Sequence, residues 1–337
     1  MTDTAKPVTP ERIMQMAWGY APPLILEAAI HHRVFDVLDE GPKTLEQLSA
    51  STGASARGLR SIADALVGFE LLARTSGGAY TLTPESAAFL VSTKPSFQGG
   101  MIKHTSIQLL PRWLKLNEVV KTGKPVSSVN VEGQGAAFFH DFVIDIFPLS
   151  YPAAQELAVH LNLTATGATS ALDLAAGSGV WGIALAQAAP NLRVTSVDWP
   201  EVIPVTQKVV GQFGLTDRFT FSSGDLMQAD FGSDHNVATL GHILHSEGEE
   251  RSKALLANTF AALASGGTIA IQEFLVDPDR NGPPGSLIFG VNMLVNTDKG
   301  DTFSFEEISS WLVEAGFVNA RTIPTHGPSP IILATKP

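Results

Sequence analysis

A glycine-rich segment in the second half of the chain has the residue types and spacing of a nucleotide-binding loop. Gly177, Gly179 and Gly182 follow an apolar run and precede a helical stretch, in the order G-x-G-x-x-G. Glycine is needed where the backbone must approach a ligand closely. Folds that bind nicotinamide dinucleotides and folds that bind methyl donors share this spacing. The loop therefore predicts a nucleoside cofactor without deciding which one.

Three acidic residues narrow the choice, because each stands at the end of a strand-like run. Asp173 lies four residues before Gly177, where a carboxylate would repel a pyrophosphate but suits the ammonium and sulfonium groups of S-adenosylmethionine. Asp198 can accept hydrogen bonds from ribose hydroxyls, which both cofactors carry. Asp225 can contact an adenine amino group, with Leu226 against the ring. Each alone could be a turn former, but the three together favour S-adenosylmethionine.

The elements that must position these residues alternate between strand and helix from residue 170 onward. Alternation of this kind predicts an α/β fold, with a parallel sheet and helices on both faces. Ser304 and Glu307 form a capping box before a helix that ends at Gly316. An antiparallel hairpin with its turn at 326–329 should follow and close one sheet edge. The predicted strands cover 171–175, 193–197, 219–222, 237–240, 268–274, 317–322 and 331–335.

The first hundred residues are predicted to be helical apart from one small hairpin. Thr44 caps a short helix with Gln47 as its capping-box partner, a longer helix covers 55–72, and a hairpin covers 73–82. Helix, helix and hairpin in this order are a winged-helix layout. A DNA reader needs several basic residues on one face, whereas here the basic side chains of the second helix are mixed with acidic ones and Arg74 is alone in the wing. A scaffold or dimerisation role is therefore favoured.

The helical segment from 97 to 158 is rich in aromatic residues. Any one of them is explained by ordinary helix packing, but the group indicates a lid over a pocket for a flat substrate. The group comprises Trp113, Phe138, Phe139, Phe142, Phe147 and Tyr151.

The overall composition limits the partners. Lys and Arg number 22 and Asp and Glu 33, which gives a net charge of −11, so phosphate backbones and anionic membranes would repel the chain. Without cysteine there is no thiolate nucleophile and no Cys-based zinc site, and no compact His and carboxylate cluster predicts another metal. No apolar run reaches the ~18 residues of a membrane helix, and the polar start does not resemble a secretory signal. We expect a cytoplasmic protein with neither nucleic-acid nor membrane partners.

A family resemblance follows from these motifs taken in order. Asp173 through Gly179, Asp198-Trp199-Pro200, Gly224-Asp225-Leu226, Ile243-Leu244-His245 and the closing hairpin resemble the small-molecule O-methyltransferases of the caffeate and hydroxyindole type, especially their bacterial branch. The resemblance covers nearly the whole chain. It implies a Rossmann-like seven-stranded sheet of order 3-2-1-4-5-7-6, with strand 7 antiparallel. It also implies a homodimer, formed through a winged-helix dimerisation domain at 1–100, with a helical lid at 101–165 and a catalytic domain at 166–337.

The resemblance also implies roles for individual residues. His245 would take the proton from the acceptor hydroxyl, which suits a side chain that is mostly neutral at pH 7, and Glu273 would orient its imidazole. His242, three residues earlier, is the competing candidate for the base. The positions that match the acceptor-lining helix are Phe289, Asn292 and Met293, with Phe142 and Phe147 facing them from the lid.

The chain also departs from the family pattern. Ser246 stands where plant members have aspartate, and Gly241 where they have lysine. The second carboxylate that plant members place near the base is left open between Asp301 and Thr302.

The implied reaction is methyl transfer from S-adenosylmethionine to a hydroxyl of a small, aromatic acceptor, with S-adenosylhomocysteine as the product and no metal. The sequence does not separate O- from N-, S- or C-methylation. Three alternatives remain: a decarboxylase, hydroxylase or pericyclase on the same scaffold, a nicotinamide oxidoreductase, and a winged-helix DNA-binding regulator with the methyl donor as its ligand.

Overall fold

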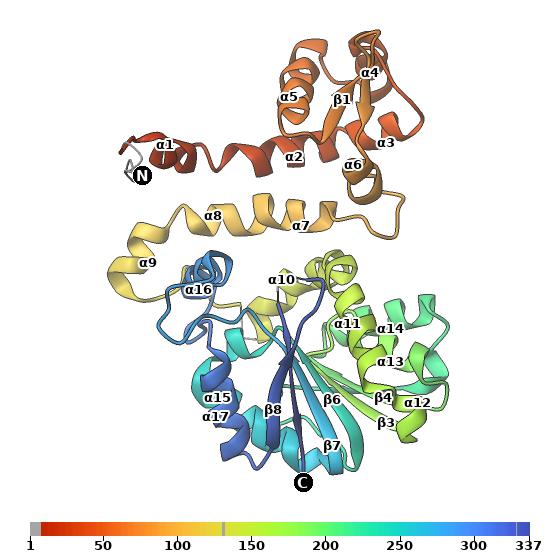
Figure 1. The fold of residues 1–337 in the computed structure, drawn as a ribbon, viewed down its shortest axis with the longest axis vertical. Helices are drawn as coiled ribbons and strands as arrows, with labels where there is room; N and C mark the ends of the chain where they lie inside the picture. Colours follow the sequence, from red (N-terminus) through yellow and green to blue (C-terminus); the bar gives the residue numbers. More distant parts are fainter. Residues whose placement is uncertain (1–7, 130–131, 328) are drawn as a thin grey trace, which may run out of the picture. The chain divides into compact units, whose positions relative to one another are not determined.

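The computed structural model describes residues 8–129, 132–327 and 329–337, and it divides into two compact units, one up to Leu110 and the other from Pro111 onward (Figure 1). The first unit is mainly helical with one two-stranded hairpin. Its elements are α1 (Glu11–Ala17), α2 (Ala21–His31), α3 (Val34–Asp39), α4 (Leu45–Thr52), α5 (Ala56–Gly68), β1 (Leu72–Arg74), β2 (Tyr80–Leu82), α6 (Pro84–Phe89), α7 (Gly99–His104) and a π-helical turn (Thr105–Leu109).

The winged-helix layout of this unit is confirmed, with one boundary corrected. Thr44 caps α4 in a capping box with Gln47, and β1 and β2 pair antiparallel as the wing. The helix expected to reach Leu72 ends at Gly68 instead, because Glu70 takes a positive φ of 61° that cannot continue a helix. Leu72 then begins β1, opposite Leu82.

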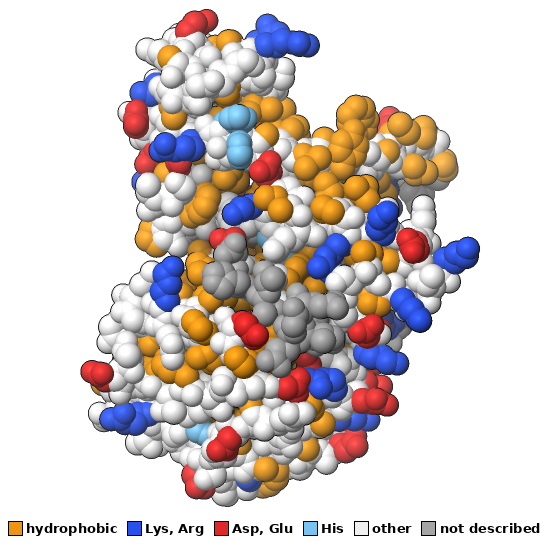
Figure 2. Space-filling view, turned by 180° about the vertical axis from the view of Figure 1, so that it is seen from behind, with side chains coloured by type: hydrophobic (Ala, Val, Ile, Leu, Met, Phe, Trp, Pro, Cys, Tyr) orange, Lys and Arg blue, Asp and Glu red, His pale blue; other side chains and the backbone are white. Residues whose placement is uncertain are grey.

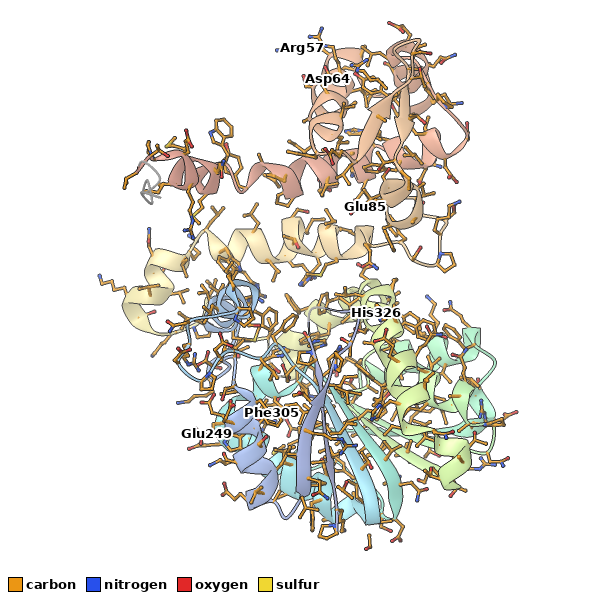
Figure 3. All side chains as sticks on the ribbon, in the orientation of Figure 1. Arg57, Asp64, Glu85, Glu249, Phe305 and His326 are labelled. Carbon is orange, nitrogen blue, oxygen red and sulfur yellow. The ribbon has the colours of Figure 1, made fainter. Side chains whose placement is uncertain are left out.

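The basic side chain of the wing is engaged within the unit. Arg74 donates to the Tyr80 hydroxyl at 2.8 Å and forms an ion pair with Asp64 of α5, and the Tyr80 hydroxyl donates to the same carboxylate at 2.7 Å. Figure 3 shows Asp64 on α5 together with Arg57, which is exposed. The charge of Arg74 is therefore balanced locally.

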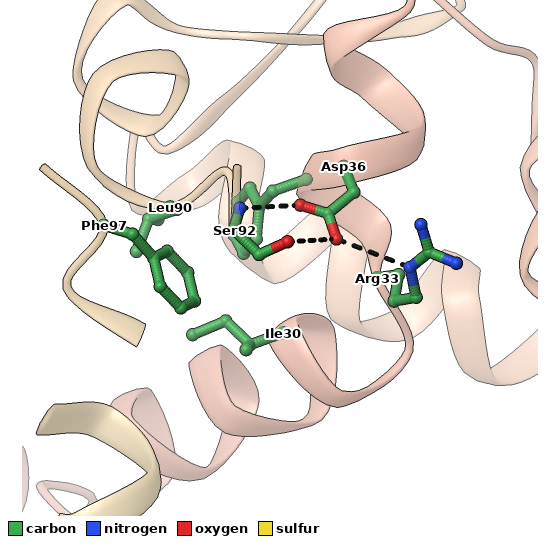
Figure 4. Close-up of a pocket in the computed structure, with 7 residues that line it drawn as sticks. Ile30, Arg33, Asp36, Leu90, Ser92 and Phe97 are labelled. Atoms are coloured by element: carbon green, nitrogen blue, oxygen red, sulfur yellow. Dashed lines mark hydrogen bonds and ion pairs between the residues drawn. The ribbon is translucent and has the colours of Figure 1, made fainter. Parts of the chain in front are cut away.

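A small hollow in this unit lies between α3 and the segment that follows α6. Asp36 accepts from the Ser92 backbone N–H at 2.8 Å and from its hydroxyl at 2.9 Å, with Ile30 and Phe97 beside them (Figure 4). The cavity measures about 10 Å³, roughly the room of a single water molecule. It is too small to be a substrate site.

Large apolar side chains are exposed on α1 and just after it. Figure 2 shows hydrophobic side chains gathered over this stretch, at the upper right of the view. Apolar patches of this kind mark interaction surfaces. We call the group the α1 patch, and its members are Ile13, Met14, Met16, Trp18 and Tyr20, each 54–70% exposed.

The second unit is a seven-stranded sheet with helices on both faces (Figure 1). Its strands are β3 (Ser170–Leu174), β4 (Arg193–Asp198), β5 (Phe219–Ser223), β6 (His235–Gly241), β7 (Leu263–Gln272), β8 (Val318–Ile323) and β9 (Ile331–Thr335). Its helices are α8 (Leu110–Trp113), α9 (Leu116–Thr122), α10 (Glu132–Asp145), α11 (Phe147–Leu161), α12 (Leu163–Thr166), α13 (Val180–Ala188), α14 (Ile203–Gln212), a 3-10 turn (Thr216–Arg218), α15 (Leu244–Ala262), α16 (Pro284–Asn296) and α17 (Phe305–Glu314).

The strand order, β5-β4-β3-β6-β7-β9-β8, confirms the order expected from the resemblance, with β9 antiparallel to both β7 and β8. Alternate residues of the strands face opposite sides: Leu172 packs toward α15 and α17, whereas Ala171 packs toward α13 and α14. Ser304 and Glu307 form the expected capping box of α17. The expected turn at 326–329 includes Pro328, which is outside the described residues; beside it, His326 pairs with Glu156 of α11 (Figure 3).

The topology brings the functional candidates to one edge. Because β3, β4, β5, β6 and β7 are parallel, the loops that follow them leave the sheet at the same edge. The chain reverses its winding direction between β3 and β6, and ligands bind at such a switch point in open α/β sheets. No helix within the described ranges is long and apolar enough to span a lipid bilayer.

Candidate functional site

The glycine loop between β3 and α13 is built on alternate left-handed residues. Ala175, Gly177 and Gly179 have φ values of 50°, 56° and 77°. Gly182 has a different role, because it lies inside α13, where an added Cβ would be 2.8 Å from Val194. The left-handed positions of the loop are therefore 175, 177 and 179. The sequence interpretation missed Ala175, since alanine rarely adopts this conformation.

Asp173 braces the loop from within the sheet. Its carboxylate accepts from the Thr239 hydroxyl at 2.8 Å and from the Gly182 backbone N–H at 3.1 Å, and the residue is fully buried. Burial raises its pKa to about 7. The sequence interpretation placed this carboxylate at the ligand-facing edge, whereas it joins β3, β6 and α13 beneath that edge.

Asp198 holds the loop from the neighbouring strand. One carboxylate oxygen accepts from the Gly177 backbone N–H at 2.7 Å and the other from the Trp199 backbone N–H at 2.7 Å. The Thr206 hydroxyl donates to the Gly177 carbonyl at 2.7 Å, which fixes the other side of the same residue. Burial raises the pKa of Asp198 to about 6. The side chain is only partly covered, so it can still meet a ligand.

Asp225 lies after β5 and belongs to a three-residue ionic network. It accepts from the Met227 backbone N–H at 2.8 Å and from Arg251 at 2.9 Å, and Arg251 also donates to Glu247. This network links the end of β5 to the first turns of α15. Leu226 is 7% exposed and packs in the apolar cluster of the sheet.

His245 and Glu273 form a buried pair at the ends of β6 and β7. The distance from Nδ1 of His245 to Oε2 of Glu273 is 2.8 Å, and the His245 backbone N–H donates to the other carboxylate oxygen at 3.3 Å. Burial alone would raise the pKa of Glu273, but the nearby His245 and its hydrogen bonds hold that pKa below its usual value. An ionised Glu273 accepts a hydrogen bond from Nδ1–H of His245, and in this tautomer Nε2 carries a lone pair. This is the tautomer that a general base requires.

The second carboxylate that the sequence left open does not reach the imidazole. Asp301 pairs with Arg280 at 3.1 Å and is about half exposed, while its backbone N–H donates to the His245 carbonyl at 2.9 Å. Thr302 is buried beside it. Among the described residues, the carboxylate hydrogen-bonded to the His245 imidazole is that of Glu273.

His242 lies next to this pair in a different environment. Its Nε2 is 3.2 Å from the Ser329 hydroxyl, and its ring centroid is 6.3 Å from that of His245. Burial lowers its pKa to about 4, so it is neutral near pH 7. The Nε2 atom of His242 is paired with a hydroxyl, whereas the Nδ1 atom of His245 is paired with a carboxylate. Of the two histidines, His245 therefore has the geometry expected of a base.

Aromatic rings surround His245 on one side. The Phe289 ring of α16 meets it edge-on at 4.8 Å, and Phe274 lies 4.2 Å from Phe289. The sequence interpretation did not single out Phe274, whose position directly after Glu273 was its only signal. Met293 is buried one turn further along α16, and the Oδ1 atom of Asn292 accepts from Trp113 at 2.9 Å.

The two lid phenylalanines occupy different surroundings. Phe142 belongs to a cluster on α10 with Phe138 and Phe139, and Phe139 reaches Trp199 directly after Asp198. The ring of Phe147 stacks instead on Tyr151 at 5.0 Å and on Phe213 at 5.4 Å, in the packing of α11 against α14. Phe142 therefore belongs to the aromatic cluster of α10, whereas Phe147 packs with Tyr151 and Phe213 and against the cluster that contains Val180 and Trp181 of α13. Over the residues described, no three His, Asp or Glu side chains are grouped to hold a metal ion.

The glycine at position 241, where plant relatives have lysine, is explained by Trp181. An added Cβ at Gly241 would lie 1.9 Å from Nε1 of Trp181. We expect Gly241→Ala to destabilise the protein by about 1–3 kcal/mol, because the packed indole has to move, and the additional change Trp181→Phe to recover part of that loss. Urea unfolding measures both. Gly68→Ala, which meets no atom within 4 Å, is the control, and equal unfolding midpoints for the two alanine variants would contradict the explanation.

Comparison with known proteins places this site in a family. A model of the O-methyltransferase domain matches residues 154–318, and a model of the O-methyltransferase dimerisation domain matches residues 14–92. The chain is 30% identical to the tetracenomycin polyketide synthesis 8-O-methyl transferase TcmO of Streptomyces glaucescens, over 97% of each chain. It is also 30% identical to the 3-hydroxy-5-methyl-1-naphthoate 3-O-methyltransferase of Streptomyces sahachiroi, over 93% of this chain and 91% of that one.

A crystal structure of a proposed O-methyltransferase from Nostoc punctiforme superimposes with a TM-score of 0.89 at 26% identity, covering 98% of this chain and 100% of that chain. The two family models and the 30% identity over nearly the full length of the chain identify the family. The chain belongs to the S-adenosylmethionine-dependent O-methyltransferases.

Proposed function

We propose that this enzyme methylates a hydroxyl of a small aromatic acceptor, with His245 as the general base. The observation that carries the proposal is the 2.8 Å contact between Nδ1 of His245 and Glu273, which leaves Nε2 available for the acceptor proton. The names of the two Streptomyces relatives, which describe a polyketide and a naphthoate substrate, support an aromatic acceptor.

The cofactor site is proposed at the edge formed by the ends of β3, β4 and β5. Asp198 would accept hydrogen bonds from ribose hydroxyls, Asp225 from the adenine amino group with Leu226 beneath the ring, and Gly177 and Gly179 would allow the backbone to approach the amino-acid portion. Asp173 would hold the loop in shape through its bonds to Thr239 and Gly182. These acidic groups suit a cationic nucleoside better than a dinucleotide, since like charges repel.

S-adenosylmethionine, when bound, supplies a methyl group carried on positively charged sulfur. The chain would do the rest by position: Phe289 and Phe274 hold a flat ring against His245, Nε2 of His245 takes the hydroxyl proton, and Glu273 stabilises the resulting imidazolium. The acceptor oxygen would gain the methyl group and lose its proton to His245, and the broken carbon–sulfur bond would leave the cofactor as the neutral thioether S-adenosylhomocysteine. Alignment in a site shielded from water supplies much of the rate in such reactions.

The acceptor surface is proposed on α16 and α10. Phe289, Asn292 and Met293 would contact the acceptor from α16, and Phe142 from α10. The contacts of Phe147 with Tyr151 and Phe213 favour a packing role for that residue.

The N-terminal unit is proposed to form the homodimer that its dimerisation-domain match supports. The exposed α1 patch is the surface we assign to it, and the pairing of Arg74 with Asp64 speaks against a DNA-reading wing. A cytoplasmic location and the lack of nucleic-acid and membrane partners stay predictions from the sequence.

Cofactor affinity should depend on pH through Asp198. Its pKa of about 6 in the ligand-free protein means that a proton must leave before the carboxylate can accept from ribose with full strength. We expect S-adenosylhomocysteine to bind about tenfold more tightly at about pH 7 than at about pH 5, with proton release at the lower pH. Calorimetry in buffers of different ionisation enthalpy measures both quantities.

The stability of the ligand-free protein should change in the opposite direction. The folded-state pKa values of Asp173 and Asp198 both lie above the ordinary value of 3.8. The stabilisation of the folded state that these raised pKa values provide is therefore complete below about pH 4. It is lost as the pH rises through about 6 to 7. An affinity that does not change between about pH 5 and 7 would contradict the role given to Asp198.

The reaction type is tested by product analysis. Incubation with S-adenosylmethionine and a panel of hydroxyarenes should give O-methylated product and S-adenosylhomocysteine in equal amounts. Cofactor binding with conversion of the acceptor but no S-adenosylhomocysteine would favour a non-methylating enzyme on the same scaffold.

A further inference from the structure

A chain of hydrogen bonds on α16 fixes the orientation of a side chain at the proposed acceptor surface. Arg112 donates to Oδ1 of Asn296 at 3.0 Å, Asn296 donates through Nδ2 to Oδ1 of Asn292 at 3.0 Å, and Trp113 donates to the same oxygen at 2.9 Å. The Asn296 amide also donates to the Asn292 backbone carbonyl at 2.8 Å. We call these four residues the amide chain.

The two ends of the amide chain determine which way both amides face. Arginine and the tryptophan indole are donors only and have no acceptor to offer. Asn296 must therefore turn its oxygen to Arg112 and its nitrogen to Asn292, and Asn292 must turn its oxygen to Trp113. With both lone pairs of that oxygen occupied, the group Asn292 has left to offer is its N–H₂.

The amide chain is held firmly by its surroundings. Arg112 donates also to the Ser127 carbonyl at 3.1 Å, and its guanidinium lies 5.1 Å from the centre of the Phe138 ring. The backbone N–H of Val129 donates to the Asn296 carbonyl at 2.9 Å. Because Asn296 is fixed in this way, a reversal of the Asn292 amide would break the hydrogen bonds that its Oδ1 atom accepts from Trp113 and Asn296.

The free amide group lies close to the proposed reaction centre. Asn292 is three residues after Phe289, so the two share a side of α16, and the Phe289 ring is 4.8 Å from that of His245. Helix α16 packs against both α15, which begins beside His245, and α9 (Figure 1). Asn292 is only partly covered, and no acceptor for its Nδ2 is found among the residues that the structure describes.

We propose that Arg112 and Trp113 act as positioning residues that make Asn292 a hydrogen-bond donor toward the acceptor, and that the enzyme accordingly prefers hydroxyarenes that carry a carbonyl on the ring system. The inference rests on the proposed function of this site. A carbonyl oxygen satisfies the amide N–H directly. A second hydroxyl could also accept, but its own proton would then need a partner that Asn292 cannot provide. The substrate class is therefore that of hydroxyaryl ketones and hydroxyquinones rather than polyphenols.

The test uses pairs of acceptors with the same rings and the same reacting hydroxyl, such as 2-hydroxyanthraquinone with 2-hydroxyanthracene, and analogous naphthalene pairs. The ratio of kcat/KM within each pair is the readout. We expect the wild-type enzyme to favour the carbonyl-bearing member about tenfold or more, since a buried donor left without a partner is costly. Asn292→Asp should reverse that preference, because a carboxylate repels the carbonyl oxygen of one member and meets no such oxygen on the other.

Trp113→Phe tests the orienting step separately. It removes one of the two donors that hold Oδ1 of Asn292 while keeping an aromatic ring, so Asn296 alone orients the amide and the within-pair ratio should fall below that of the wild type. The Kd of S-adenosylhomocysteine should not change. If Trp113 merely stabilised the fold, its replacement would lower kcat/KM equally for both members of a pair. The ratio would then stay the same. For Asn292→Asp, the matched control is Asn191→Asp, which introduces the same charge at an exposed loop position.

The possible failures are distinguishable. A wild-type preference for the carbonyl-free member, or a ratio unchanged in both Asn292→Asp and Trp113→Phe, would overturn this inference while leaving methyl transfer in place. An enzyme that binds S-adenosylhomocysteine but methylates no member of the panel would contradict the proposed function and this inference with it.

Discussion

Replacing His245 with glutamine is expected to lower kcat for methyl transfer by about 10²–10⁴-fold, the usual contribution of a positioned general base. Glutamine keeps the size and can still donate to Glu273, but it cannot take the acceptor proton. S-adenosylmethionine should bind with nearly unchanged affinity, because the strand-end carboxylates and the glycine loop are untouched. Single-turnover formation of S-adenosylhomocysteine measures the effect directly.

His242→Gln is the matched control for that experiment. His242 faces the Ser329 hydroxyl rather than a carboxylate, and its low pKa of about 4 makes it a weak base. We expect its kcat to remain within severalfold of wild type. If His245→Gln turned over normally and His242→Gln did not, the base would be His242. The proposal that Glu273 orients a catalytic His245 would then be wrong.

Replacing Asp198 with alanine is expected to weaken S-adenosylhomocysteine binding by about a hundredfold or more. Hydrogen bonds to a charged group contribute about 1.5–3 kcal/mol each, and the two ribose hydroxyls would lose their acceptor. The change also frees the backbone N–H of Gly177, which Asp198 holds at 2.7 Å. The glycine loop would then lose a hydrogen bond that fixes its conformation, and the site would lose the negative charge of Asp198. Calorimetric titration measures the loss.

Asp217→Ala provides the control for Asp198→Ala. Asp217 is an exposed acidic residue in the 3-10 turn before β5, so it changes the net charge by the same amount without touching the loop. Its Kd should match that of the wild type. Equal Kd values for Asp198→Ala and the wild type would show that the cofactor does not lie along the ends of β3 and β4.

Several parts of the structure could be predicted because they depend on local patterns. The capping boxes at Thr44 and Ser304 need only a residue and its neighbour three positions later. The alternation of strands and helices after residue 170 determines a parallel sheet, and the hairpin at the end determines its antiparallel edge. His245 and Glu273 follow adjacent parallel strands, so their meeting follows from the topology once the strands are assigned.

Other parts could not be predicted because they depend on contacts between distant residues. Asp173 carries the charge that a cationic ligand would favour, yet Thr239 and Gly182 bind it inside the sheet. Phe147 has the aromatic character of a lid residue, but stacking with Phe213 of the segment after α14 determines its place. No sequence pattern indicates which of several packing partners an aromatic ring will find.

Two further features depend on backbone conformation and on side-chain length. Ala175 adopts a left-handed conformation normally reserved for glycine, and nothing in its residue type announces it. Arg251 spans from Glu247 to Asp225, so the proposed adenine-binding carboxylate is tied to the helix that begins next to the base. A residue six positions after His245 carries no motif that would connect it to β5.

The central claim, methyl transfer from S-adenosylmethionine to an acceptor oxygen, is tested most directly with an isotopically labelled methyl group. The enzyme is incubated with the labelled cofactor and the hydroxyarene panel, and the labelled product is examined by mass spectrometry and NMR. We expect a labelled methoxy group and one equivalent of S-adenosylhomocysteine for each product molecule. Label found on nitrogen or carbon, or a converted acceptor that contains no label, would contradict the claim.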